Sequence, residues 1–418
     1  MILQNEYLKN TDRSTSKHRF RHRHHMHLFG PAWLTMMADM DAASTISAAE
    51  VGATFKYGLI WFMLLLIIPL FFIQEAAGRI GVVTQQGLGT VIRKHYSKST
   101  ALALTIPMVI TDVITYIAEY AGIAIGLKIF GISPFISLPV VFVLHVLLIT
   151  KRKYAQFEKL LLAISGVLIT TFVITLIFRG IKPYSPIYVL PSTSFFFMLA
   201  VTVGAVVMPF MLFFQASAAG EKVSSAREHL GEEGETYLKR KALSLSKKET
   251  LIGAIVTEVL MVVVEMVATG IDPSDNLMSP KELSTILSSI AGPLSPYIFG
   301  IGLAAAGFLA LVVVSLGSAW GFVEAANIPK DKAWIVYVLE SLPAVFVPMI
   351  FSSDLINFML NLMVVFVFVL IGPGIMVGVI SSNKKIMGEY VSNKKWKAFY
   401  WGSLSFVLIF GFIALKSL

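Results

Sequence analysis

Residues 36–46 read MMADMDAASTI, a run of small and acidic residues that interrupts an otherwise apolar stretch of the chain. Apolar sequence leads into the run over residues 29–35 and resumes from Val51 to Ile73. A carboxylate at bilayer depth costs about 2.5–3.5 kcal/mol on insertion scales, so Asp39 and Asp41 need a cation or a water-lined cavity. The stretch therefore predicts a membrane-spanning helix that is broken near its middle.

A broken helix of this kind offers carboxylate and backbone oxygens near the midplane of the bilayer, where many secondary transporters bind their ions. Ala42 and Ala43 let neighbouring helices approach closely, and Ser44 adds a hydroxyl group. The alternative is a kinked helix whose acids lie at its cytoplasmic end. The register favours Asp41 as the ion ligand, with Asp39 as a second acid on the ion pathway.

The composition of the chain is that of a membrane protein. Of 418 residues, 56% are hydrophobic and only 14% are charged, whereas soluble domains carry about 25% charged residues. The net charge of +9 comes from basic residues in short loops, which indicates membrane topology and no nucleic-acid partner. The sequence has no cysteine, no nucleotide-binding loop and no hydrolase or zinc motif. We therefore expect gradient-driven transport, no enzymatic activity and no permanently bound cofactor.

Eleven apolar segments recur at lengths suited to a hydrocarbon core about 30 Å thick. They lie at residues 29–54, 58–77, 100–127, 136–150, 158–178, 193–218, 250–270, 296–320, 333–351, 355–380 and 398–415. Most of the 34 Lys and Arg residues fall in alternate loops, which predicts a cytoplasmic N-terminus and a C-terminus outside. The longest inner loop, residues 220–249, mixes charge signs and reads as solvated or helical.

Residues 1–27 form a basic tail that contains five of the eight histidines. The sequence fits a cytoplasmic tail that obeys the positive-inside rule. The alternative is a weak metal-collecting tract, because neutral imidazoles bind borderline metals. The transporter domain then covers residues 28–418.

The sixth segment contains a second break, in VGAVVMPFMLFFQ at residues 203–215. Pro209 removes a helix hydrogen bond and frees carbonyls near Ala205, and Met208 adds a polarizable thioether. Breaks in segments one and six predict two inverted five-helix repeats, at about residues 29–178 and 193–380, with an extra helix at 398–415. The expected fold is an all-α polytopic membrane protein with the LeuT-like architecture.

Other segments carry acids that apolar helices rarely contain. Glu258 and Glu265 are seven residues apart in the seventh segment, as are Asp112 and Glu119 in the third, so each pair shares a helix face. Glu119, Glu258 and Glu265 are candidates for the ion pathway, although Glu119 and Glu258 have no evident partner. In the tenth segment, Asn361 is a polar residue that could face the site.

Several stretches match a known family of transporters. They are residues 30–61, Gln74–Thr84 (QEAAGRIGVVT), Ala118–Gly122 (AEYAG), Met208-Pro209 and Asn383–Gly388 (NKKIMG). Together they resemble the Nramp family of divalent-metal transporters, in pattern closest to its magnesium-transporting branch. In this resemblance Asp41-Ala-Ala-Ser44 occupies the place of the family's Asp-Pro-Gly-Asn metal motif.

The resemblance implies a multi-pass protein of a prokaryotic-type cell membrane that carries divalent cations by alternating access. Its metal ligands would be Asp41, Ser44, the Ala205 carbonyl and Met208, and its partners would be metal ions and the lipid bilayer, with the chain a monomer. The alternatives are an amino-acid or organic-solute symporter of the same architecture and a non-transporting metal sensor or scaffold. An acid in the break argues against the symporter, because it repels a substrate carboxylate.

The chain also departs from the family pattern. Where the family has a histidine after Met-Pro, this chain has Phe210. Where many relatives have a second acid seven residues beyond Glu119, it has Gly126. Neither residue can carry a proton, which predicts weak or no coupling of transport to protons. Ser44 replaces an asparagine with a shorter ligand. The pattern of the magnesium-transporting branch favours Mg²⁺, which prefers oxygen ligands. The Met208 sulfur favours Mn²⁺ or Fe²⁺ instead.

Overall fold

The computed structural model describes residues 29–151, 154–190, 192–227, 232–272, 277, 279–350 and 355–414. The His-rich tail at residues 1–27 lies outside this part of the chain, so both interpretations of it stay predictions. Most of the described residues are helical, and among them there is one isolated bridge, between Thr269 and Ile271, and no strand. The all-α expectation is confirmed.

The helices follow one another along the chain. They are α2 (Pro31–Ala38), α3 (Ala42–Phe55), α4 (Ile60–Thr84), α5 (Leu88–His95), α6 (Lys98–Lys128), α7 (Pro134–Lys151), α8 (Tyr154–Arg179), α9 (Thr193–Val206), α10 (Pro209–Arg227), α11 (Glu232–Ala268), α12 (Pro280–Ala291), α13 (Ser295–Ala326), η1 (Lys330–Lys332), α14 (Ala333–Ile350), α15 (Leu355–Ser381), α16 (Lys384–Met387), η2 (Gly388–Tyr390) and α17 (Lys394–Ala414). Among the described residues, nine helical stretches are long and apolar enough to cross a membrane, with α9 and α10 counted as one.

Each apolar segment expected from the sequence overlaps a helix. The first segment is divided between α2 and α3, and the fourth is the shorter apolar helix α7. The expected inner loop at residues 220–249 is largely helical, which was one of the two interpretations of its composition: α10 continues to Arg227 and α11 begins at Glu232. The short helices α5 and α12 were not expected, since each is too short to span a bilayer.

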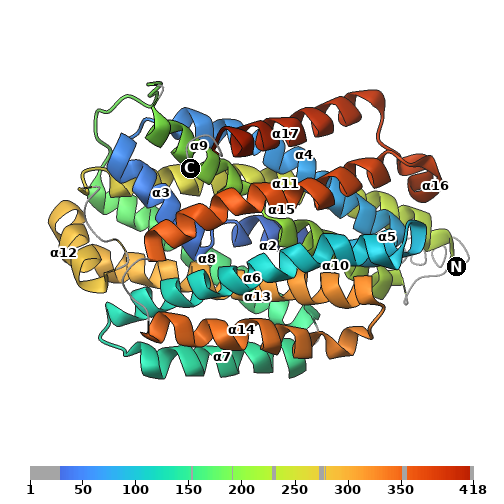
Figure 1. Ribbon diagram of the computed structural model, residues 1–418, viewed down its shortest axis with the longest axis horizontal. Coiled ribbons are helices and arrows are strands. Elements are labelled where there is room, and N and C mark those ends of the chain that lie inside the picture. Colours follow the sequence, from blue (N-terminus) through green and yellow to red (C-terminus); the bar gives the residue numbers. More distant parts are fainter. Residues whose placement is uncertain are drawn as a thin grey trace, which may run out of the picture.

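Most helices run along the long axis of the molecule, with α12 near one end and α5 and α16 near the other (Figure 1). The long helix α13 packs against α6, α8 and α10, and α4 packs against α10 and α11. Small residues permit these close approaches. A side chain at Gly126 of α6, for example, would overlap the backbone carbonyl of Gly300 in α13. The two broken helices lie inside this arrangement.

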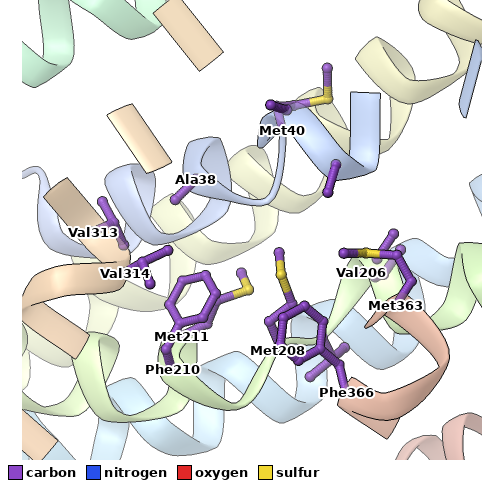
Figure 2. Packing of buried hydrophobic residues seen from close by; sticks show 14 of the residues in the cluster. Ala38, Met40, Val206, Met208, Phe210, Met211, Val313, Val314, Met363 and Phe366 are labelled. Atoms are coloured by element: carbon purple, nitrogen blue, oxygen red, sulfur yellow. The ribbon is translucent and has the colours of Figure 1, made fainter. Parts of the chain in front are cut away.

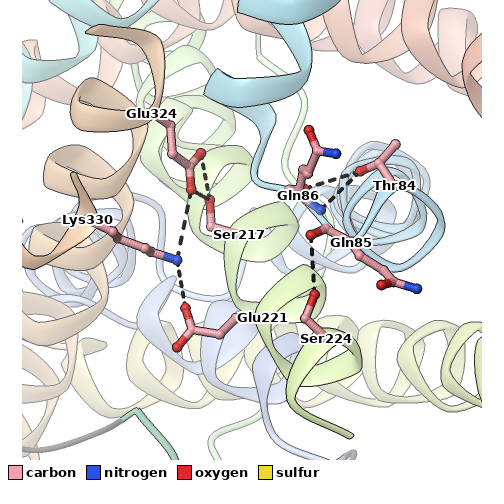
Figure 3. A network of polar contacts seen from close by, with 8 residues as sticks. All are labelled: Thr84, Gln85, Gln86, Ser217, Glu221, Ser224, Glu324 and Lys330. Atoms are coloured by element: carbon pink, nitrogen blue, oxygen red, sulfur yellow. Dashed lines mark hydrogen bonds and ion pairs between the residues drawn. The ribbon is translucent and has the colours of Figure 1, made fainter. Parts of the chain in front are cut away.

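A polar network joins α10 to α13 near α5 (Figure 3). The Lys330 ammonium pairs with Glu221 at 2.6 Å and lies 4.0 Å from Glu324 and 3.7 Å from the centre of the Trp320 ring. The Ser217 hydroxyl donates a hydrogen bond to Glu324 at 2.9 Å. Ser217, Glu221, Glu324 and Lys330 border a cavity of about 340 Å³. The network therefore holds α10 and α13 together at this end of the bundle.

Candidate functional site

Residues 39–41 separate α2 from α3. Asp39 is the C-cap of α2, and Asp41 is the N-cap of α3. The Asp41 backbone is extended, and its side chain accepts a hydrogen bond from the Ser44 N–H at 2.5 Å. An acid at an N-cap satisfies a free N–H group and faces the positive end of the helix dipole. The Asp-Ala-Ala-Ser spacing thus starts a new helix inside the segment and fixes the Asp41 carboxylate.

The second break separates α9 from α10. α9 ends at Val206, and Pro209 is the first residue of α10. Proline fits the first position of a helix, but it has no N–H group for the carbonyl four residues earlier. That carbonyl belongs to Ala205, so it has no partner in the helix ladder. Ala205 and Met208 are both fully buried.

The two breaks face one another. The Ser44 hydroxyl donates a hydrogen bond to the Ala205 carbonyl at 3.4 Å and lies 4.0 Å from the Met363 sulfur. Three of the predicted ligands, Asp41, Ser44 and Ala205, are therefore linked by contacts. In Figure 2 the side chains of Met208 and Met363 point from the α9–α10 break and from α15 into the same region, below the α2–α3 break.

Buried oxygens at the first break lack hydrogen-bond partners. Among the described residues these are Asp41 Oδ2, Thr45 Oγ1 and both carboxylate oxygens of Asp39. Such atoms are costly when they are left unpaired, and a cation satisfies them. The described part of the chain has no group of three or more His, Cys, Asp or Glu side chains placed to hold a metal ion. A cation at Asp41 would thus take its other ligands from carbonyl, hydroxyl and sulfur groups.

Further acids flank the first break on both sides. Glu119 in α6 accepts a hydrogen bond from the Ala42 N–H at 3.0 Å and is close enough to Asp41 for electrostatic interaction. Glu258 in α11 interacts with Asp39 in the same way. The expectation that Glu119 has no partner is wrong, because α6 packs against the broken helix and brings Glu119 to the Ala42 N–H. Neither carboxylate oxygen of Glu258 has a hydrogen-bond partner among the described residues, although α11 places Glu258 beside Asp39. Four buried carboxyl groups therefore lie in a row across the α2–α3 break, in the order Glu258, Asp39, Asp41 and Glu119.

The position of Glu119 depends on a glycine in the same motif. Gly122 follows Glu119 by one helical turn, and a side chain there would overlap the Ala42 side chain. Its absence lets α6 approach the start of α3. The AEYAG stretch therefore combines the acid with the small residue that brings this acid to the break.

Three other candidates lie in different surroundings. Glu265 accepts a hydrogen bond from the Leu59 N–H at 3.0 Å and so anchors the start of α4. Phe210 is buried in the apolar cluster beside Met208 (Figure 2). Asn361 is exposed, whereas Met363, two residues later, contacts Ser44. Met363 was not among the predicted ligands, because nothing in the sequence of the tenth segment fixes which helix face meets the site.

A second buried polar network, also missed, joins α6, α7 and α14. The Tyr116 hydroxyl donates to Glu340 at 3.0 Å, and the hydroxyl groups of Tyr120 and Tyr337 are 3.2 Å apart. Tyr337 also forms a hydrogen bond with His145 Nδ1. The signals in the sequence were a histidine inside the apolar fourth segment, His145, and an acid inside the apolar ninth segment, Glu340, because buried polar groups require partners.

The comparison with known families agrees with this geometry. Residues 32–416 match the family described as natural resistance-associated macrophage protein-like, Nramp. The chain belongs to this family. A divalent metal cation transporter, MntH, from Yersinia pestis (strain Pestoides F) is 25% identical over 385 residues, which cover 88% of this chain and 89% of the relative. The resemblance seen in the sequence motifs is confirmed.

Solved structures share the fold of this Nramp chain. A manganese transporter of Eremococcus coleocola, in complex with an aromatic bis-isothiourea substituted compound, matches with a TM-score of 0.77 at 18% identity, over 93% of this chain and 86% of that one. MhsT in complex with L-phenylalanine matches with a TM-score of 0.61 at 14% identity, over 93% of this chain and 98% of that one. At these identities the matches show the fold alone. The chain is an integral, multi-pass membrane protein of the LeuT-like architecture.

Proposed function

We propose that this chain is a secondary transporter that moves divalent metal cations across the membrane by alternating access. The observation that carries the proposal is the buried Asp41 carboxylate, whose Oδ2 has no hydrogen-bond partner among the described residues. It lies near the Ala205 carbonyl, which has no partner in the helix ladder and accepts a hydrogen bond from Ser44. The relatives named above are a divalent metal cation transporter and a manganese transporter. The Nramp family is one of transporters, so we propose no enzymatic role.

Each proposed ligand has a distinct part. Asp41 supplies negative charge, which lowers the cost of placing a divalent cation at this depth. The Ala205 carbonyl and the Ser44 hydroxyl supply neutral oxygens, Met208 supplies a thioether, and water completes the shell. The metal is cargo here, and no permanently bound cofactor is proposed.

The choice of metal follows from the ligand chemistry. Mg²⁺ dehydrates reluctantly and prefers oxygen ligands. A thioether adds nothing for Mg²⁺ but favours softer ions. Met208 therefore supports Mn²⁺ or Fe²⁺ over Mg²⁺ as the transported ion.

Access to the site requires a rearrangement of the helices. Asp41, Ser44, Ala205 and Met208 all have 0% exposure, so a metal ion cannot reach them in this conformation. The backbone hydrogen-bond ladder is interrupted after α2 and after α9, so the half-helices on either side of each break can move separately. We propose that these half-helices open the site to one side of the membrane at a time, and that Asp39, Glu119 and Glu258 line the route.

The arrangement in the membrane is also a proposal. The basic helices α5 and α16 lie near the same end of the bundle (Figure 1), which supports a cytoplasmic position for that end. The N-terminus would then be cytoplasmic and the C-terminus outside. We propose inverted repeats at about residues 29–178 and 193–380, a peripheral helix at 398–415 and a monomeric protein in the lipid bilayer.

Uptake into proteoliposomes tests the proposed function. The purified chain is reconstituted and offered Mn²⁺, Fe²⁺, Cd²⁺, Mg²⁺ and Ca²⁺ in turn, with empty liposomes as the control. Saturable uptake of Mn²⁺ that unlabelled amino acids do not inhibit is expected. Uptake of an amino acid with no uptake of any divalent ion would instead favour the symporter, which no observation in the site supports.

A further inference from the structure

Met363 of α15 lies at the candidate metal site, although sequence motifs do not mark it. Its side chain is fully buried, and its sulfur is 4.0 Å from the Ser44 hydroxyl. The same hydroxyl donates to the Ala205 carbonyl at 3.4 Å. One oxygen of the site thus touches both a proposed ligand and the Met363 thioether.

Close packing between α9 and α15 fixes this position. A side chain at Gly204, next to Ala205, would overlap the backbone carbonyl of Met363. The absence of a side chain at Gly204 lets the two helices touch at their backbones. Met363 is therefore held beside the α9–α10 break by the fold itself.

Filling of the apolar core is the simpler role for a buried methionine, because its flexible side chain occupies irregular gaps. Met363 does belong to the apolar cluster that also contains Val206 and Phe366 (Figure 2). Two features distinguish it from a gap filler. Its sulfur contacts a hydroxyl of the site, and its side chain points toward the region that the Met208 side chain also enters (Figure 2).

We propose that Met363 is a second sulfur ligand, so that a bound ion meets thioethers of Met208 and Met363 on one side and the Asp41 carboxylate on the other. This inference rests on the proposed function and deepens it by naming the class of metal. Two thioethers favour softer divalent ions over harder ones more strongly than a single thioether does, with the largest effect for Cd²⁺ and a smaller one for Mn²⁺. The site thus selects Cd²⁺ and Mn²⁺ against Mg²⁺ and Ca²⁺.

Calorimetric titration with Cd²⁺, Mn²⁺ and Mg²⁺ tests the inference on purified full-length protein. The variants are Met363→Leu and Met208→Leu, which keep side-chain volume and remove sulfur. Met376→Leu is the matched control, because it lies on the same helix more than three turns away. The expected result is a loss of Cd²⁺ affinity of roughly tenfold or more in each site variant, with Mg²⁺ binding and the control unchanged.

X-ray absorption of bound Cd²⁺ provides a readout that packing alone would not alter. The wild type should show two sulfur neighbours, and each single variant should show one. Unchanged Cd²⁺ affinity in Met363→Leu, equal losses for Cd²⁺ and Mg²⁺, or a single sulfur neighbour in the wild type would overturn the inference.

Asp41→Asn separates this inference from the proposed function. If Asp41→Asn loses Cd²⁺ and Mn²⁺ binding while Met363→Leu binds like the wild type, the metal site stands and Met363 is a packing residue. If the wild type binds no divalent ion, both the proposed function and the inference fail.

Discussion

Glu119 accepts a hydrogen bond from the backbone N–H of Ala42 at 3.0 Å, across the interface between α6 and α3. Ala42 directly follows Asp41, so its N–H is one of the unpaired donors at the start of α3. The acid in the third segment therefore holds the first turn of the helix that begins at Asp41, the proposed metal ligand. Glu119 would thus have a structural role in addition to its proposed place on the ion route.

Variants of Glu119 separate these two roles. Glu119→Leu leaves the Ala42 N–H buried without an acceptor, which should destabilise the protein by about 1–3 kcal/mol. Glu119→Gln keeps an acceptor oxygen, so its stability should stay close to that of the wild type. Chemical unfolding in detergent micelles measures both. Equal stability of the two variants would contradict the role of Glu119 as a cap.

Gly204 should tolerate no side chain. Gly204→Ala places a methyl group against the Met363 carbonyl, and overpacking of this kind costs about 1–3 kcal/mol. Gly166→Ala is the matched control, since the space around that helical glycine is open, and alanine there should stabilise α8 by up to about 1 kcal/mol. Thermal unfolding is the measurement. A melting temperature of Gly204→Ala equal to that of the wild type would contradict the proposed backbone contact between α9 and α15.

Metal transport should be weakly coupled or uncoupled to protons. Phe210 cannot carry a proton, and Gly126 has no room for an acid because any side chain would overlap the Gly300 carbonyl. Glu119 is engaged with the Ala42 N–H. The membrane potential alone favours entry of a cation by about 2.3 kcal/mol per charge per 100 mV, so a proton gradient is not required.

A pH-sensitive dye inside proteoliposomes tests this coupling while an inward Mn²⁺ gradient is imposed. Little acidification of the lumen is expected during Mn²⁺ uptake. The alternative is that protons move along the row of carboxyl groups formed by Glu258, Asp39, Asp41 and Glu119. Acidification that requires Mn²⁺ and disappears in Glu119→Gln would show that these acids do carry protons.

The sequence predicted the parts of the site that depend on local chemistry. Asp41 and Pro209 each break a helix through their own backbone and side-chain properties, so both breaks could be placed without a structure. Met363 could not be placed, because apolar residues fill most positions of α15 and its register depends on the contact with Gly204. The polar residue that the sequence singled out there, Asn361, is exposed. The neighbours of Glu258 and Glu119 were also missed, since their pairing with Asp39 and Asp41 depends on how α11 and α6 pack.

The most direct test of the central claim is Mn²⁺ uptake by proteoliposomes that contain Asp41→Asn. Asparagine caps a helix as well as aspartate does, so the variant should fold and insert while it lacks the charge that binds the cation. Asp331→Asn, at an exposed position in η1, is the matched control for loss of a carboxylate. We expect Asp41→Asn to lose saturable Mn²⁺ uptake and Asp331→Asn to transport like the wild type; near-wild-type uptake by Asp41→Asn would contradict the account.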